Sequence, residues 1–191
     1  MAARSLYANL SDASDPGERT ARLHSLLRAN FDATWRLLRR LGVSEGDLDD
    51  AVQEVVLVLA RKLDEIESDR ERAFVLSTAY RVASTWRRAR RRRPEMLDVD
   101  AQAIVDPAAA SDELLDRQRA RALLDRVLDA MPLDVRAVFV LYELERLTMA
   151  EIAEALELPP GTVASRLRRA RAVFQSHVDA LETHRQEFPN E

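Results

Sequence analysis

The sequence contains no cysteine, so disulfide bonds and cysteine-ligated zinc or iron–sulfur centres are excluded. Glycine is scarce, with 4 residues in 191, and long alternating runs typical of β-strands are absent. No apolar run approaches the roughly 20 residues that a membrane-spanning helix needs. The N-terminal stretch MAARSLYANLSDASDPGER lacks the apolar core of a signal peptide. We therefore expect a soluble cytoplasmic protein without a membrane-inserted segment.

The residues that are abundant favour helices. Ala, Leu, Arg and Glu dominate the composition, and all four have high helix propensity. Apolar residues make up 47%, which is enough for a buried core, and the length suits one domain or two small ones. The composition therefore predicts an all-α protein.

Positive charge is concentrated in two segments of a chain whose net charge is −4. Residues 81–93 contain seven arginines and residues 161–171 contain four, and neither segment contains an acid. Two basic segments on an acidic chain predict two contacts with a polyanion and a separate surface for another partner. Lys62 is the only lysine. Arginine suits bidentate contacts to phosphate and guanine, although an arginine-rich genome would give the same bias.

Helical periodicity predicts two small helical domains joined by a flexible linker. Helices are expected over about 19–41, 47–66 and 70–92, and the apolar stripe of the first comprises Leu23, Leu26, Leu27, Phe31, Trp35 and Leu38. A second helical block has breaks near 131–132, 147–148 and 159–161. The expected boundaries are a flexible segment 1–18, a domain 19–93, a linker 94–111, a domain 112–181 and a tail 182–191 that frays after Glu182.

The second predicted helix has an apolar face and an acidic face. At about 100° per residue, one stripe comprises Leu48, Val52, Val55, Val56, Leu59, Leu63 and Ile66. The opposite face comprises Asp50, Gln53, Glu54 and Leu57. An apolar residue among acids is what a docking surface for a basic partner needs. The alternative is an ordinary solvated face with one stray leucine.

Residues 147–171 have the pattern of a helix-turn-helix. Thr148 and Glu151 form a predicted capping box at the start of a short helix. Pro159 and Pro160 then enforce a corner, since neither can continue the helix. Thr162 is expected to cap or begin the second helix.

The second helix of this pair is also two-faced. The face expected to pack inward comprises Val163, Leu167, Ala170 and Phe174. The outward face comprises Ser165, Arg168, Arg169 and Ala172, with Thr162, Ala164 and Arg166 at its flanks. Small residues allow close approach to a groove, and arginines reach phosphates and guanine edges. The pattern therefore predicts a recognition helix for the DNA major groove, the alternative being a helical hairpin with a solvated basic face.

Both segments resemble parts of one bacterial family. DLDDAVQEVVL, from Asp47, resembles the polymerase-binding segment of sigma factors. The stretch from Met131 to Arg171 resembles the promoter-reading domain of the extracytoplasmic function (ECF) sigma factors. The two resemblances cover about residues 20–93 and 112–180, in the family's order.

This resemblance implies three sets of functional residues. The surface for the β′ clamp helices of RNA polymerase corresponds to Asp49, Asp50, Gln53 and Glu54, beside Leu57. The helix that reads the −35 element corresponds to Thr162, Ser165, Arg166, Arg168 and Arg169. The segment that opens and reads the −10 element corresponds to residues 74–88, with Phe74, Arg81, Trp86, Arg87 and Arg88 as expected contacts. The implied partners are core RNA polymerase (β′ clamp helices and β flap), promoter DNA and an anti-sigma factor, with no cofactor, metal or catalytic residue.

The chain departs from the family pattern mainly in the −10 segment. Phe74 stands where the family usually has Trp, and Arg81 and Thr85 stand where it often has Asn and Asp. Ala164 replaces a frequent Lys in the −35 helix. These differences affect the expected −10 preference more than polymerase binding. Trp86 is itself open to two interpretations, base stacking or half-buried packing.

Two other function classes remain as alternatives. One is a dimeric helix-turn-helix regulator whose N-terminal helices dimerise or sense a signal. The other is an enzyme, which is disfavoured because the sequence has no nucleotide-binding loop, HExxH motif or nucleophile elbow, and its three histidines are isolated.

Overall fold

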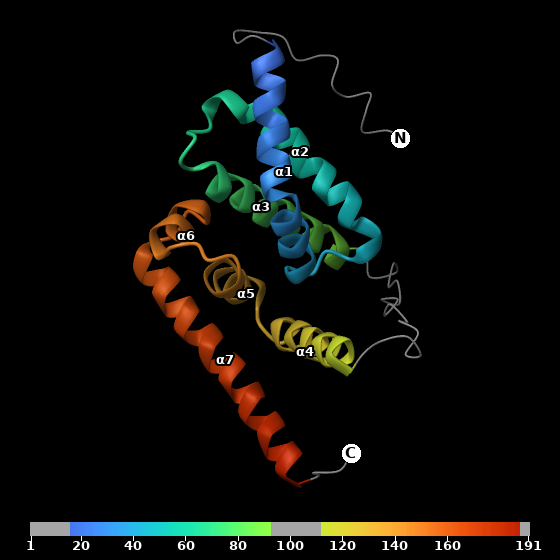
Figure 1. The fold of residues 1–191 in the computed structure, drawn as a ribbon. Helices are drawn as coiled ribbons and strands as arrows, with labels where there is room; N and C mark the ends of the chain where they lie inside the picture. Colours follow the sequence, from blue (N-terminus) through green and yellow to red (C-terminus); the bar gives the residue numbers. More distant parts are fainter. Residues whose placement is uncertain (1–15, 93–111, 188–191) are drawn as a thin grey trace. The chain divides into compact units, whose positions relative to one another are not determined.

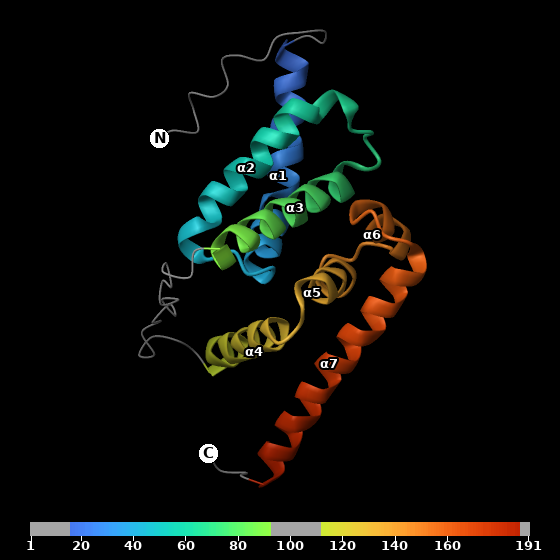
Figure 2. The same cartoon turned by 180° about the vertical axis from the view of Figure 1, so that it is seen from behind.

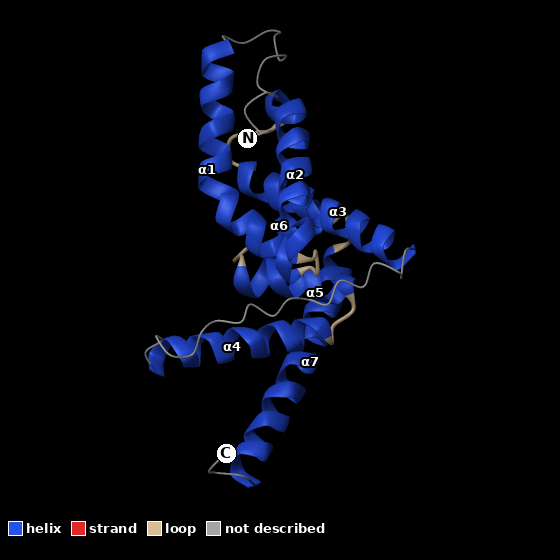
Figure 3. Cartoon of the chain, turned by 90° about the vertical axis from the view of Figure 1, so that its right-hand side faces the viewer, coloured by secondary structure: helices blue, strands red, loops and turns tan. Residues whose placement is uncertain are grey.

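The computed structural model describes residues 16–92 and 112–187. Within these two ranges the regular structure is helical and no strand is present (Figure 3). The described residues fall into two compact units, one in each range. The predictions of an all-α fold and of two small helical domains are confirmed. The expected linker at 94–111 and most of the expected N-terminal segment 1–18 lie outside the described residues.

The first unit is a bundle of α1 (Pro16–Arg40), α2 (Leu48–Lys62) and α3 (Glu71–Arg92), in which each helix packs against the other two (Figure 1). Short 3₁₀ turns at Glu45–Asp47 and Leu63–Glu65 flank α2. The core is aliphatic, and its fully buried side chains include Leu37, Leu38, Leu41, Leu48, Leu59 and Leu76. Burial of these stripes stabilises the bundle by about 25 cal/mol per Å² of apolar surface removed from water.

A glycine ends α1. Gly42 has φ 86°, in the left-handed region that a side chain disfavours. Its N–H donates to the Arg39 carbonyl (2.9 Å) and the Val43 N–H donates to the Leu38 carbonyl (3.1 Å). This is a Schellman motif, which satisfies the last carbonyls of the helix and lets the chain turn towards α2.

Phe31 departs from its predicted place in the apolar stripe of α1. Leu23, Leu26 and Leu38 are buried as expected, but Phe31 is 51% exposed. The neighbouring α2 residues at this level are Val52 and Val56, which line an apolar groove together with Phe31 instead of covering its ring. Periodicity placed the residue on the correct side of the helix but could not predict how far its neighbours reach.

Two arginines of α1 fasten the far end of α2. Arg22 Nε donates to Glu71 Oε1 (3.0 Å), and its Nη1 donates to the Leu63 carbonyl (3.2 Å). Arg19 Nε donates to Asp64 Oδ2 (3.0 Å), and its Nη2 donates to the Ala60 carbonyl (2.9 Å). The carbonyls at the end of a helix lack partners within the helix. The guanidinium groups satisfy them while pairing with acids of the same turn and of α3.

The second unit contains α4 (Asp112–Asp129), α5 (Leu133–Phe139), a π-helical turn at Val140–Leu144, α6 (Met149–Ala155) and α7 (Pro160–Glu187). Helices α5 and α6 pack on the N-terminal half of α7 (Figure 2). The rings of Phe139 and Phe174 stack with centroids 5.4 Å apart. Contrary to the expected fraying after Glu182, α7 continues to Glu187.

The core of the second unit includes a charged side chain. Arg136 is 2% exposed, and its Nη1 donates to Asp129 Oδ1 at the end of α4 (2.9 Å). Burial lowers the pKa of Arg136, and the attraction of Asp129 opposes that change. Arg136 thus ties α5 to α4 through an ion pair whose loss would leave a buried charge without compensation.

The hydrogen bonds and ion pair of Arg22 lead to a prediction about the stability of the first unit. Arg22→Ala should lower the free energy of unfolding of the first unit by about 1–3 kcal/mol, because Glu71 and the carbonyls of Leu63 and Ile66 lose their donor. Chemical denaturation of the full chain, followed by circular dichroism, measures the change. Lys62→Ala is the control. It removes the exposed pair with Glu65 and should cost less than about 0.5 kcal/mol. Equal costs would contradict the role given to Arg22.

Candidate nucleic-acid and protein interfaces

The helix-turn-helix begins with the predicted capping box. Thr148 is the N-cap of α6, and its Oγ1 accepts a hydrogen bond from the Glu151 N–H (3.2 Å). The Glu151 carboxylate in turn accepts from the Thr148 N–H (2.7 Å). Two N–H groups that the first turn would leave without partners are satisfied, so the start of α6 is fixed by its own sequence.

The corner between α6 and α7 is a Schellman motif formed without glycine. The Glu157 N–H donates to the Glu154 carbonyl (3.1 Å) and the Leu158 N–H donates to the Ala153 carbonyl (2.8 Å). Glu157 occupies the left-handed position with φ 54°. A side chain at such a φ strains the backbone, and the strain is accepted here because the chain must reverse between two packed helices.

The second helix begins earlier than the sequence predicted. It starts at Pro160, and the N–H groups of Thr162 and Val163 both donate to the Pro159 carbonyl. Proline suits the first helical position because its φ is already helical and no N–H partner is needed there. Thr162 is therefore inside the first turn of α7 and neither caps nor begins the helix.

The two faces of α7 are divided as predicted. Val163, Leu167 and Ala170 are buried against α5 and α6, and Phe174 is half-buried. The outward residues Ser165, Arg168, Arg169 and Ala172 are all exposed. Ser165 Oγ donates to the Thr162 carbonyl (2.9 Å), so this small side chain lies close to its own helix. The small side chains of the outward face therefore leave the helix backbone accessible, and two long cationic side chains project beside it.

The four arginines of this segment differ in what they contact. Arg166 pairs with Asp134 of α5 (3.2 Å) and is half-buried. Arg171 Nε donates to Glu143 Oε1 (2.7 Å), and its guanidinium lies 5.3 Å from the centre of the Tyr142 ring. Glu143 raises the pKa of Arg171 through this hydrogen bond. Both arginines brace α7 against the preceding helices.

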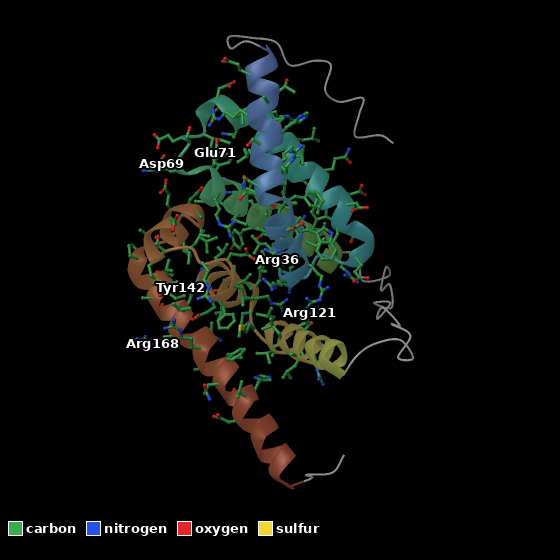
Figure 4. All side chains as sticks on the ribbon, viewed as in Figure 1. Arg36, Asp69, Glu71, Arg121, Tyr142 and Arg168 are labelled. Atoms are coloured by element: carbon green, nitrogen blue, oxygen red, sulfur yellow. The ribbon has the colours of Figure 1, made fainter. Side chains whose placement is uncertain are left out.

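Arg168 and Arg169 are exposed and pair with no acid among the residues that the structure describes. Arg168 lies on the side of α7 that faces away from α5 (Figure 4). The resemblance grouped Arg166 with these two, although at about 100° per residue it lies about 160° from Arg168 in helical projection, at the flank of the outward face. The partners of the bracing arginines are 28 and 32 residues earlier in the chain, and periodicity does not reveal such pairs.

The acidic residues of α2 are accessible. Asp49, Asp50 and Glu54 are exposed, and Gln53 and Leu57 are half-buried. Asp49 and Asp50 make no ion pair with another described residue. Within residues 16–92 and 112–187, no group of acids and histidines could hold a metal ion. The surface has the charge and the apolar component that a basic protein partner requires.

The structure joins the acidic surface to α3, which the sequence did not predict. The indole N–H of Trp86 donates to Glu54 Oε2 (2.9 Å), and Trp86 is half-buried. Arg87 Nη1 donates to the Leu41 carbonyl at the end of α1 (2.9 Å). Both residues thus contribute to packing of the bundle. Of the other expected −10 contacts, Arg81 and Arg88 are exposed and Phe74 is half-buried.

The known proteins that this chain resembles in sequence are bacterial sigma factors. Residues 121–173 match the model of sigma-70, region 4. The chain is 30% identical over 148 residues to the ECF RNA polymerase sigma-E factor of Escherichia coli K12, covering 73% of this chain and 78% of the relative. It is also 30% identical over 152 residues to the sigma-E factor of Haemophilus influenzae. The chain belongs to the ECF RNA polymerase sigma factor family, whose members associate with core RNA polymerase and direct promoter-specific initiation.

Two solved structures share the fold. CnrH in complex with the cytosolic domain of CnrY matches with a TM-score of 0.62 and 23% identity, over 83% of this chain and 88% of that chain. RpoE of Bartonella quintana, in complex with the anti-sigma factor NepR, matches with a TM-score of 0.63 and 19% identity, over 82% and 96%. At these identities the likeness concerns the fold alone. In the described ranges, no helix is both long and apolar enough to cross a membrane.

The left-handed backbone conformation of Glu157 leads to a second prediction about stability. Glu157→Gly should raise the free energy of unfolding by about 0.5–1 kcal/mol, because glycine adopts φ 54° without a steric cost. Thermal unfolding followed by circular dichroism should show a higher midpoint. Ala150→Gly, which places glycine at an exposed position of α6, should destabilise by about 1 kcal/mol. A decrease for Glu157→Gly would show that the Glu157 side chain contributes more than its backbone strain costs.

Proposed function

We propose that the second unit reads the −35 element through the outward face of α7, and that the first unit binds polymerase through α2 and contacts the −10 element through α3. The observation that carries the proposal is the exposed pair Arg168 and Arg169 on the second helix of a capped, tightly turned helix-turn-helix. Such a helix enters the major groove, where arginine recognises guanine edges and phosphates. We assign polymerase binding and the −10 contact to a domain of residues 19–93, and the −35 contact to a domain of residues 112–181.

Within the −35 surface, the arginines have different tasks. Arg168 and Arg169 contact DNA, and Ser165 and Thr162 allow the start of the helix to approach the groove. Arg166 and Arg171 set the rotation of α7 about its own axis through Asp134 and Glu143. Because docking angle decides which base each side chain meets, these braces contribute to promoter preference without contacting a base.

The −35 assignment is tested by removing the two exposed charges. Arg168→Ala with Arg169→Ala should lower transcription from a −35-dependent promoter by at least roughly 30-fold, because each of the two arginine contacts to a base or phosphate is worth about 1–3 kcal/mol. Affinity for core polymerase should be unchanged. The matched control is Arg121→Ala with Arg126→Ala, which removes the same charge from exposed positions of α4. Loss of polymerase binding in the α7 variant would refute the assignment of this face.

On α3, the exposed Arg81 and Arg88 are the groups best placed to contact the phosphates of the −10 region. The hydrogen bond of Trp86 to Glu54 fixes the position of the indole ring, which is half-buried, and so limits how it can stack on a base. Arg87 holds the end of α1. The two DNA-binding surfaces gain affinity when one large partner holds both, because the second contact then occurs at high effective concentration.

The polymerase-binding surface consists of Asp49, Asp50, Gln53, Glu54 and Leu57. The acids select a basic partner, and Leu57 adds apolar area at its edge. The protein acts without catalysis of its own and works in the cytoplasm, where the polymerase is. The partners named for the two similar structures, one of them an anti-sigma factor, support an anti-sigma factor as a regulator of this chain also.

Charge reversal tests the polymerase-binding surface while sparing the Trp86–Glu54 bond. Asp49→Arg with Asp50→Arg should weaken binding to core RNA polymerase at least about tenfold, because like charges then face the basic partner. Co-elution with core polymerase on a sizing column is the measurement. Asp32→Arg with Asp69→Arg reverses the same charge at exposed positions of α1 and the loop before α3, and it should co-elute as wild type does. Equal behaviour of the two variants would contradict the assignment.

A further inference from the structure

The turn that leads into the helix-turn-helix has a strained residue. Arg146 has φ 62°, in the left-handed region, and lies between the π-helical turn Val140–Leu144 and the N-cap Thr148. Gly42 has a similar conformation where α1 ends, with φ 86°, and glycine adopts it without the steric cost that a side chain has. Arginine therefore makes this turn less stable than glycine would. A residue kept in such a conformation often has a functional side chain.

The backbone on both sides of Arg146 is fixed by the packing of its neighbours. Glu145 and Leu147 are buried. The Glu145 N–H donates to the Val140 carbonyl (2.9 Å), and the Leu147 N–H donates to the Leu141 carbonyl (3.0 Å). Arg146 itself is exposed, and its side chain pairs with no acid among the residues that the structure describes. The fold therefore presents a cation to solvent on a rigid turn.

The same turn packs beside the outward face of α7. Glu143 pairs with Arg171 (2.7 Å), whose guanidinium lies 5.3 Å from the centre of the Tyr142 ring. At about 100° per residue, Arg171 is about 60° from Arg168 around the axis of α7. Tyr142 accordingly lies beside the stretch of α7 that carries Arg168 (Figure 4). Arg146 follows Glu143 by three residues, or at most about 11 Å of chain, so its charge adds to the positive charge on this side of the second unit.

In a helix-turn-helix, the first helix crosses the DNA backbone while the second lies in the major groove. The residues that lead into α6 then lie closer to the phosphates at the edge of the groove than to the bases. We propose that Arg146 binds a phosphate beside the −35 element and so fixes the position of α7 in the groove without reading a base. Because the turn is rigid before DNA binds, only the arginine side chain is ordered on binding. This inference rests on the −35 function proposed for α7 and adds a residue that sequence reasoning did not assign to DNA.

The test uses holoenzyme assembled from core RNA polymerase and the full chain. Its affinity is measured at several salt concentrations for a promoter duplex and for the same duplex with a scrambled −35 element. Arg146→Gly should weaken binding to both duplexes by the same factor, roughly threefold to tenfold, because a phosphate contact carries no sequence information. The slope of log affinity against log salt should become shallower by about 1. Arg146→Lys keeps the charge and should bind within about twofold of wild type.

Glu157→Gly is the matched control, because it places glycine at the left-handed residue after α6 without removing a cation. Both glycine variants should have a higher thermal midpoint than wild type, measured by circular dichroism. Weaker DNA binding by Arg146→Gly would then not result from a less stable fold. Glu157→Gly should bind both duplexes at least as tightly as wild type, since it removes a negative charge.

The outcomes separate this inference from the −35 function on which it rests. If Arg146→Gly binds both duplexes as wild type does, while Arg168→Ala with Arg169→Ala loses its preference for the intact −35 element, the inference is overturned and the function of α7 stands. If that double variant keeps the preference, the −35 assignment fails and the inference fails with it. A loss by Arg146→Gly on the intact element alone would mean that Arg146 reads a base, and an equal loss by Glu157→Gly would mean that the backbone of the turn is responsible. Either result overturns the phosphate contact. Equal losses on both duplexes, with a shallower salt slope and near-normal binding by Arg146→Lys, support it.

Discussion

Arginine side chains that cross from one helix to another hold the ends of these helices in place. Arg22 bridges from α1 to Glu71 and to the carbonyls of Leu63 and Ile66, and Arg136 bridges from α5 to Asp129. The guanidinium group suits this because its five donors can bind a carboxylate and a carbonyl together. The chain lacks disulfides and has few glycines, so these contacts and the aliphatic core together determine where each helix ends. An arginine-rich sequence is therefore not simply a DNA-binding one.

The pairing of arginines within the fold explains how an acidic chain can contain two arginine-rich segments. The net charge is −4 although the chain carries 29 basic residues, and several arginines in the basic segments are paired within the fold. Arg166, Arg171 and Arg87 each contact another helix or its end. Among the described residues of the basic segments, Arg168 and Arg169 on the outward face of α7 are exposed and pair with no acid. The acidic surface on α2, which is proposed to bind a protein partner, does not attract DNA.

Local chemistry made much of this structure predictable. The capping box of Thr148 and Glu151, the buried face of α7 and the approximate bounds of the first three helices all follow from periodicity and from residues within one turn of each other. The proline corner was anticipated, but the start of α7 at Pro160 was not, because two prolines in succession leave open which one begins the helix. Each such feature depends on neighbours in sequence.

Features that depend on distant neighbours could not be predicted. The hydrogen bond between Trp86 and Glu54 joins residues 32 apart in the chain, and it links two surfaces that the sequence treated separately. The exposure of Phe31 depends on how far Val52 and Val56 reach from another helix. The pattern of apolar and polar residues predicts which face of a helix a residue occupies. How deeply its side chain is buried depends on the size and position of the side chains that pack against it. The resemblance to sigma factors predicted which segments are functional but did not predict these contacts.

The length of α7 has a mechanical consequence. It spans 28 residues, about 42 Å at 1.5 Å per residue, and α5 and α6 pack on its first half. A continuous α-helix resists twisting, because rotation about its axis distorts every hydrogen bond along it. A partner that binds the last turns of α7 and rotates them therefore also rotates Arg168 and Arg169 about the helix axis. With the −35 function proposed for α7, such a partner would alter promoter reading without any contact of its own with DNA.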